Sequence, residues 1–322
     1  MVGMNSPDDT DPMDRTDHTG RTHRTDHLEL GGVGITRVTE YAGPLGMTPA
    51  TFLATDSEET WHANSSWLAP DFFDPDTGTV NAVVQTWVVR SEGRTILVDT
   101  GAGNGKERPY SPVWSHLRTD FLERLARAGV TPEDVDLVVN THLHVDHVGW
   151  NTRLEDREWV PTFPNATYLI AKDDFDFWNP ENNHRTALGR GNQNVFEDSV
   201  APVHRAGQVR LWEGSHRIDS RLRLDLAPGH TPGSCVLTLE SGTDRAVFVG
   251  DLLHSPVQIL EPDHNSCFCE DPVRARATRR RVLGWAADQR ALVVPAHLGG
   301  HGAAQVERNG PGFAIREWAP FA

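Results

Sequence analysis

Four side chains of the kinds that bind metal ions in proteins lie close together in the segment HLHVDH, residues 142–147. Imidazole and carboxylate groups are the usual ligands of zinc and similar divalent ions. Alternate residues of an extended or tightly turned segment point the same way, so His142 and His144 can face one ion. Asp146 and His147 follow a turn and can face a second ion. The concentration of ligands indicates a metal site with room for two ions.

Three further candidate ligands each follow an apolar segment that has the pattern of a strand. His230 lies in LAPGHTPGS, Asp251 in AVFVGD and His297 in LVVPAH. A lone histidine after a strand is more often a surface or capping residue, and a lone aspartate after glycine usually belongs to a turn. Nothing about a loop requires three histidines and one aspartate within six residues, so the joint pattern is specific for metal.

A pair of divalent ions would supply hydrolytic chemistry. Two ions lower the pKa of a water between them towards neutrality and polarise a carbonyl or phosphoryl oxygen. Asp146 or Asp251 can then carry a proton to the leaving group. Lactones, esters, amides and phosphotriesters are all cleaved in this way, so the ligands indicate hydrolysis and leave the substrate open.

Each ligand needs a strand or helix to hold it, and apolar periodicity predicts these elements. The segment Val135–Val139 predicts a buried strand directly before the first ligand. Helices are predicted over residues 115–128, which Gly129 ends, and over residues 272–290. Residues 60–79 have no clean period and are predicted to form a long loop. Further strands are predicted from about residue 33 and over residues 82–90, 94–99, 166–171, 208–213, 222–226, 235–240, 245–250 and 291–295.

The chain has 322 residues and a net charge of −15, from 45 acidic and 30 basic residues. Residues 1–28 lack apolar periodicity and predict a disordered tail, whereas residues 29–322 predict a single domain because no linker divides them. The acidic balance argues against a nucleic-acid partner. No apolar run is long enough to span a membrane. The first 20 residues also lack the apolar region of a secretory signal. We therefore expect a cytoplasmic protein whose three cysteines, at 235, 267 and 269, stay reduced.

The order HLHVDH, GHTPGS, GD and AH resembles that of the metallo-β-lactamase-fold hydrolase superfamily. The segment ILVDTG, residues 96–101, is similar to an early strand and turn of that fold, whose aspartate lies near the metals. The resemblance runs from about residue 33 to residue 305. It implies an α/β protein with a four-layer αβ/βα sandwich and metals at one edge, between the sheets.

The resemblance also implies which residues bind the metals. Asp251 would bridge two ions, and a hydroxide held between them would be the nucleophile. The implied cofactor is a pair of divalent ions, with Zn²⁺ favoured over Mn²⁺, Co²⁺ or Fe²⁺. One ion would take His142, His144 and His230, and the other would take Asp146, His147 and His297.

Within the superfamily, the chain most resembles the methyl-parathion-hydrolase-like and acyl-homoserine lactonase branch. The segment GDLLHSPVQ, residues 250–258, is similar to the first of these groups and has His254 where lactonases commonly have tyrosine. This implies that His254 lies beside the metals and contacts the substrate or a metal-bound oxygen; the alternative is that it only braces Asp251. Asp251 also occupies the position at which one penicillin-cleaving subclass has a cysteine ligand.

The predicted function is a dinuclear metal-dependent hydrolase that cleaves an ester-type bond of a small, largely apolar substrate: a lactone, carboxylic ester or phosphotriester. Trp61, Trp67, Phe72 and Trp150 are predicted to line the substrate pocket, because aromatic side chains bind apolar groups. The only further partner we expect is a second copy of the chain in a homodimer. Alternatives are a glyoxalase II-like thioesterase, a mononuclear iron enzyme like the persulfide dioxygenases, and a non-catalytic scaffold. The full set of seven ligands disfavours the last two.

Overall fold

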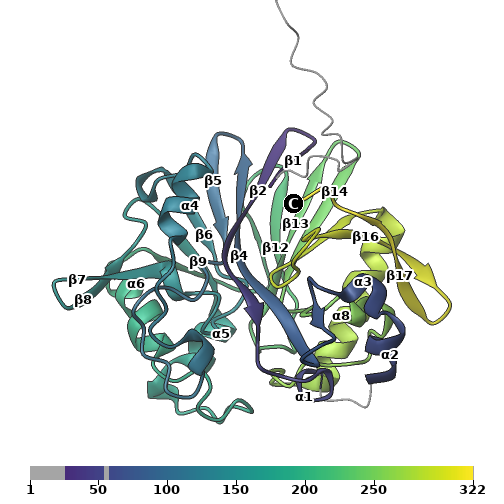
Figure 1. Ribbon diagram of the computed structural model, residues 1–322. Coiled ribbons are helices and arrows are strands. Elements are labelled where there is room, and N and C mark those ends of the chain that lie inside the picture. The colour runs from purple at the N-terminus through teal and green to yellow at the C-terminus, as the bar shows by residue number, and fades with distance from the viewer. Residues whose placement is uncertain (1–25, 54–57, 322) are drawn as a thin grey trace, which may run out of the picture.

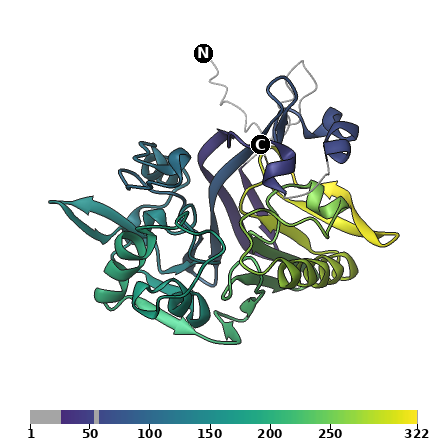
Figure 2. The same cartoon turned by 90° about the horizontal axis from the view of Figure 1, so that it is seen from below.

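The computed structural model describes residues 26–53 and 58–321. Two mixed sheets face each other, and helices cover their outer surfaces (Figure 1). Figure 2 shows the same two layers of strands from below, with α-helices on the far side of each. The predicted α/β class and four-layer αβ/βα sandwich are therefore confirmed.

The first sheet holds the strands of the amino-terminal half. They are β1 (His27–Leu30), β2 (Val33–Pro44), β3 (Phe73–Asp74), β4 (Thr79–Ser91), β5 (Arg94–Val98), β6 (Leu137–Val139), β9 (Thr167–Ala171) and β10 (Val209–Trp212). Their order is β1-β2-β4-β5-β6-β9-β10, and β3 pairs with β4. Because β5, β6, β9 and β10 run parallel, their carboxyl ends meet at one edge of the sheet.

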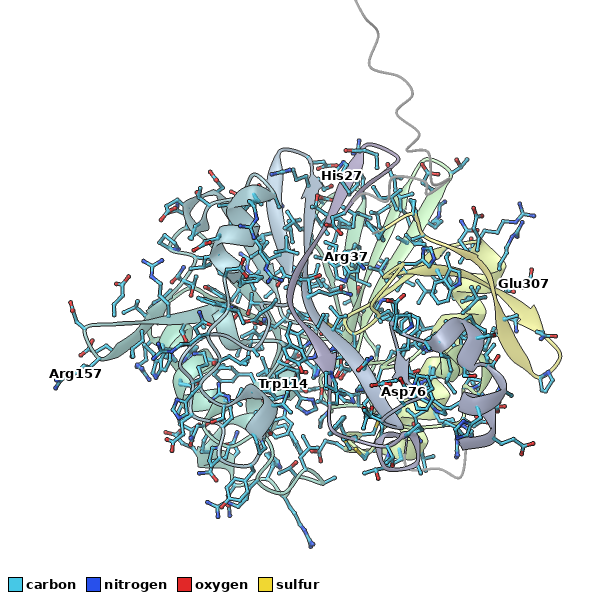
Figure 3. All side chains as sticks on the ribbon, in the orientation of Figure 1. His27, Arg37, Asp76, Trp114, Arg157 and Glu307 are labelled. Carbon is cyan, nitrogen blue, oxygen red and sulfur yellow. The ribbon has the colours of Figure 1, made fainter. Side chains whose placement is uncertain are left out.

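The second sheet holds the strands of the carboxyl-terminal half. They are β11 (Ser215–Arg217), β12 (Leu222–Leu226), β13 (Cys235–Ser241), β14 (Asp244–Gly250), β15 (Leu292–Pro295), β16 (Ala304–Asn309) and β17 (Gly312–Trp318), paired in that order. Strands β14 and β15 run parallel. A separate hairpin of β7 (Thr152–Glu155) and β8 (Glu158–Pro161) projects from the first half, with Arg157 at its tip (Figure 3).

The α-helices lie in the connections that follow β2, β5, β9 and β14. The α-helices are α1 (Pro49–Phe52), α2 (Glu58–Ala63), α3 (Ser65–Leu68), α4 (Phe121–Arg127), α5 (Lys172–Trp178), α6 (Ala201–Arg205), α7 (Val257–Leu260) and α8 (Pro272–Gln289). Single turns of tighter or wider helix cover Pro112–Trp114, Pro132–Asp134, Gly149–Asn151, Pro180–Asn182 and Phe196–Val200. None of the helices in the described part of the chain is long and apolar enough to cross a membrane.

Alternation of side chains along the strands builds the core in layers. On the inner faces of the sheets, Val89 and Ile96 belong to the same buried cluster as Leu237 and Phe248. Other side chains of the first sheet pack outward against α4, and those of the second sheet pack outward against α8. The outer helices thus hold two rigid sheets whose ends position the loops between them.

Helix α8 agrees with its prediction because both of its ends are specified locally. The side chain of Asp271 accepts a hydrogen bond from the Arg274 amide at 3.0 Å, and Pro272 occupies the first helical position. The helix ends at Gln289, because the next residue, Arg290, has a left-handed φ of 53°.

Three of the predictions about local structure are wrong. Helix α4 begins at Phe121 rather than at residue 115, because the side chain of Asn104 binds the Thr119 amide at 2.8 Å and holds that segment as a loop. Residues 60–79 are not one loop: they contain α3, β3 and the end of α2, since their aromatic side chains have a core of their own. Strand β1 begins at His27, which pairs with Thr36, so the predicted tail of residues 1–28 ends inside a strand. The rest of that tail, residues 1–25, lies outside the described residues.

Candidate metal centre

The candidate ligands gather where strand ends of the two sheets meet. The loop of residues 142–147 follows β6, Asp251 follows β14 and His297 follows β15. Gly250 allows the two sheets to come this close: its φ is +50°, and a Cβ atom there would lie 2.7 Å from the Thr141 hydroxyl oxygen. His230 reaches the same place from the loop after β12.

The first ligand group consists of three imidazoles that face one another. The Nδ1 atom of His144 lies 3.1 Å from Nε2 of His142 and 2.9 Å from Nε2 of His230. The Oδ2 atom of Asp251 lies 3.1 Å from Nε2 of His230 and 3.6 Å from Nε2 of His142. Ligand atoms around a tetrahedral zinc ion are separated by about 3.3 Å, so this spacing fits an ion.

The second ligand group lies on the other side of Asp251. The Nε2 atoms of His147 and His297 are 3.2 Å apart, and each lies 3.6 Å from an oxygen of Asp146. The Oδ1 atom of Asp251 lies 3.1 Å from Nε2 of His147 and 3.0 Å from Nε2 of His297. The structure therefore brings all seven predicted ligands into two adjoining groups, and one carboxylate touches both.

The chemistry of this donor set also fits divalent ions. Among the described residues, no hydrogen-bond donor in acceptable geometry reaches Oδ1 of Asp251, although that atom is buried. A buried carboxylate oxygen without a donor is costly, and a cation between it and the imidazoles would satisfy it. Burial, followed by the neighbouring imidazoles, holds the pKa of His142 and His144 well below the usual value, so both present neutral nitrogen ligands.

Carboxylates act in the opposite direction on three of the imidazoles. Burial opposes protonation of His230, but Asp251 and the Cys269 sulfur together outweigh it and raise the pKa of His230 to about 9. Burial also opposes protonation of His147 and His297, and nearby carboxylates, Asp251 first, raise the pKa of both. Conversely, burial favours the neutral acid of Asp251, yet the imidazoles, His147 first, hold its pKa well below the usual value. The site thus holds negative charge at its centre and protons that a metal ion would displace.

Four of the imidazoles point Nε2 into the ligand groups and are held in that orientation by contacts at Nδ1. Nδ1 of His147 lies 2.9 Å from Oδ2 of Asp99, the aspartate of ILVDTG that was expected near the metals. The other contacts involve groups that no motif marks in the sequence. They join Nδ1 of His142 to the Thr141 hydroxyl at 3.1 Å, Nδ1 of His297 to the Val83 carbonyl at 2.8 Å, and Nδ1 of His230 to the Cys269 sulfur at 3.7 Å.

His254 lies beside the first ligand group. Its Nε2 atom is 3.1 Å from Oδ2 of Asp251 and 3.3 Å from the Ser266 hydroxyl. Its ring stacks over that of His297 with centroids 5.8 Å apart. Burial lowers the pKa of His254 to about 4, so the imidazole is neutral near pH 7. A neutral imidazole carries one N–H group, and at Nε2 this group can donate to Asp251 or to an oxygen in its place.

A cavity of about 460 Å³ opens above the ligand groups. Asp146, Asp251 and His254 form part of its floor. Its walls are mainly apolar, and none of the described residues that line it is a lysine or an arginine. Trp114, labelled in Figure 3, belongs to one wall. The principal apolar wall residues are Leu45, Met47, Phe52, Val113, Trp114, Leu188 and Phe268.

The four aromatic residues predicted to line the pocket lie elsewhere, so that prediction is wrong. Trp150 donates a hydrogen bond to the buried Glu40 carboxylate at 2.6 Å and stacks on a residue of α4. Trp61 is fully buried against β3. Trp67 and Phe72 pack against Trp318 of β17. These large rings stabilise the connections around the site rather than face the cavity.

Comparisons with known proteins agree with this geometry. A family model described as "Metallo-beta-lactamase superfamily" matches residues 81–297. The mouse protein named "Metallo-beta-lactamase domain-containing protein 1" is 32% identical over 240 residues, which are 74% of this chain and 69% of that protein.

Two solved structures share the fold. One is AidC, described as a dizinc quorum-quenching lactonase in complex with a product; it is 23% identical, with a TM-score of 0.72, over 92% of this chain and 97% of that chain. The other, described as the hydrolase AbOPH in the beta lactamase superfamily, is 24% identical, with a TM-score of 0.75, over 94% and 99% of the two chains.

Proposed function

The chain belongs to the metallo-beta-lactamase superfamily, and we propose that it is a dinuclear metal-dependent hydrolase of small, uncharged and largely apolar substrates. The bond that it cleaves is of the ester type: a lactone, a carboxylic ester or a phosphotriester. The observation that carries this proposal is the position of the Asp251 carboxylate: its Oδ2 atom faces the first ligand group and its Oδ1 atom faces the second.

Zn²⁺ is the ion that we propose for both groups, because imidazole nitrogen and carboxylate oxygen are its common ligands. When bound, two such ions lower the pKa of a water between them towards neutrality and polarise the oxygen of the scissile bond. The neutral imidazoles of His142 and His144 are ready to coordinate, and the ionised Asp251 supplies one oxygen to each group.

Two residues on the cavity floor are assigned to proton transfer and substrate contact. The side chain of Asp146 is 15% exposed, whereas that of Asp251 is 5% exposed, so Asp146 is the carboxylate that can reach a leaving group. We assign to Asp146 the delivery of the proton to that group. We assign to His254 a hydrogen bond from its ring to a substrate oxygen, because the ring is neutral and lines the cavity.

The walls of the cavity support an uncharged substrate. Most of the residues that line it are apolar, and no lysine or arginine is among the described residues of the lining. A glutathione thioester carries carboxylates, which cationic side chains usually bind. The lining therefore favours an ester-type bond over the thioesterase alternative. The description of AidC as a dizinc lactonase makes a lactone with an apolar acyl chain the first substrate to test.

A substrate panel tests this proposal. Protein loaded with Zn²⁺, Mn²⁺ or Co²⁺ is assayed with lactones, aryl esters, phosphotriesters and glutathione thioesters, and oxygen consumption is recorded in parallel. We expect hydrolysis of at least one uncharged ester-type substrate, without oxygen uptake. Turnover of only the glutathione thioester would support the thioesterase alternative, and metal-dependent oxygen uptake would support an iron oxygenase.

A further inference from the structure

Helix α5 carries a buried carboxylate, Asp174, which belongs to neither ligand group. It is 1% exposed. Its Oδ2 atom accepts a hydrogen bond from the amide of Leu143 at 2.9 Å, and its Oδ1 atom accepts one from the amide of Gly233 at 2.6 Å. Leu143 lies between the ligands His142 and His144, and Gly233 closes the loop that supplies His230. One side chain therefore ties together the two loops of the first ligand group.

Helix α5 packs directly against the loop that supplies His230. A Cβ atom at Gly233 would lie 2.3 Å from the backbone nitrogen of Asp174 and 2.8 Å from its Cβ atom. No larger residue fits there without moving the loop away from α5. The close approach fixes the distance between the loop and the helix, and the carboxylate fixes its direction.

The loop of residues 142–147 is held at both backbone groups of Leu143. The Leu143 amide donates a hydrogen bond to Asp174, and the Leu143 carbonyl accepts one from the side chain of Asn192 at 2.8 Å. The Leu143 side chain itself is buried. The backbone between the two ligands His142 and His144 thus has little freedom to rotate either imidazole away.

The second ligand group does not depend on this link. Its His147 is anchored separately, since Asp99 binds the ring and the Thr100 amide donates to the His147 carbonyl at 2.7 Å. His297 follows β15, and its ring binds the Val83 carbonyl. Only the first group needs the 142–147 loop and the His230 loop to keep a fixed separation.

We propose that Asp174 is a positioning residue that fixes His142 and His144 relative to His230 and thereby sets the metal affinity of the first ligand group. This inference rests on the proposed metal centre but adds a residue that binds no ion. A carboxylate can accept hydrogen bonds from both amides at once. Asparagine has nearly the same shape but offers one acceptor oxygen, so its NH₂ group would face one of the two amides.

The test compares Asp174→Asn with Asp219→Asn. Asp219 is also a buried aspartate that accepts two backbone amides, those of Arg221 and Leu222, each at 2.8 Å, and it lies in the turn before β12. Both amides bind its Oδ1 atom, so asparagine can keep them, and this variant controls for the loss of a buried charge alone. Both variants and the wild-type protein are loaded with Co²⁺ and titrated with a chelator. Bound cobalt is counted by elemental analysis, and the absorption spectrum of the ion is recorded.

We expect the Asp174→Asn variant to lose one of two ions at a chelator concentration about 10–100-fold lower than the wild type, as for other groups that orient metal ligands. The Asp219→Asn variant should follow the wild-type curve. Excess metal should restore turnover of Asp174→Asn with an unchanged KM. A wild-type titration curve for Asp174→Asn, or equal weakening of both ions, would overturn the role of Asp174.

If Asp174→Asn does not fold, Thr231→Val decides the question. The Thr231 side chain hydrogen-bonds to Asp174 and also to the Ser234 hydroxyl at 2.7 Å, and valine removes both contacts with little change of shape. Ser234→Ala, which leaves the Asp174 contact in place, is the control. Early loss of one ion in Thr231→Val alone supports the positioning role; a wild-type curve for Thr231→Val, or the same loss in Ser234→Ala, rejects it. Wild-type protein that holds one ion would instead refute the proposed dinuclear function. The role of Asp174 would then be judged by whether its variant binds that single ion more weakly.

Discussion

The Nε2 atom of His254 lies 3.1 Å from Oδ2 of Asp251, the same oxygen that faces His142 and His230. His254 therefore contacts the shared carboxylate and also lines the cavity. This arrangement allows two roles. The ring can donate a hydrogen bond to the substrate, or it can only hold Asp251 in place.

The substitution His254→Ala separates these two roles. We expect the variant to keep both ions and to lose about 10²–10⁴-fold in kcat, the usual effect of removing a positioned hydrogen-bond donor or proton carrier. Elemental analysis and steady-state kinetics measure the two quantities. Weaker metal binding with a milder loss of kcat would show that His254 only braces Asp251. Unchanged kinetics with full metal content would exclude both roles.

Asp251→Ala should have a larger effect than the loss of any ligand that serves one group. Its two oxygens face different groups, so the variant loses a ligand to each ion and also the negative charge between the two positive ions. We expect lower metal content and the loss of most activity. Asp251→Cys should not restore activity, because a single soft thiolate sulfur cannot divide between the groups in the same way. Near-normal turnover of Asp251→Ala would show that its assignment is wrong.

Metal affinity should rise with pH. In the metal-free protein, Asp251 and the Cys269 sulfur raise the pKa of His230 to about 9, and Asp251 also raises that of His297. Below these pKa values the imidazoles hold protons, and an ion must displace them to bind. The apparent affinity should therefore fall as the pH drops below about 9. Calorimetry at pH 7 in buffers of different ionisation enthalpy should show proton release, and an affinity that does not change with pH would contradict this reasoning.

The sequence predicted the ligands far better than the pocket. The ligands lie at strand ends in a recognisable order, and the structure brings all seven together with Asp99 beside them. An aromatic residue indicates burial but not its direction, and Trp150 and Trp61 turn away from the cavity. The actual wall residues, such as Phe52, Trp114 and Phe268, come from segments far apart in the chain, so no local pattern unites them.

A pair of phenylalanine variants tests the corrected pocket. Phe268 lines the cavity, whereas Phe72 is buried against Trp318. We expect Phe268→Ala to raise KM for substrates with long apolar groups, with little change in the free energy of unfolding. Phe72→Ala should lower the free energy of unfolding by about 3–5 kcal/mol and leave KM unchanged. The opposite pattern in kinetics and urea unfolding would favour the original assignment of Phe72 to the pocket.

The central claim is that the chain needs two ions to hydrolyse its substrate. The most direct test is titration of metal-free protein with Zn²⁺ while hydrolysis of the best uncharged ester-type substrate is followed. Activity should rise until about two ions are bound per chain and then level off, as the two-metal mechanism requires. Full activity with one bound ion, or a protein that never holds more than trace metal, would contradict the account.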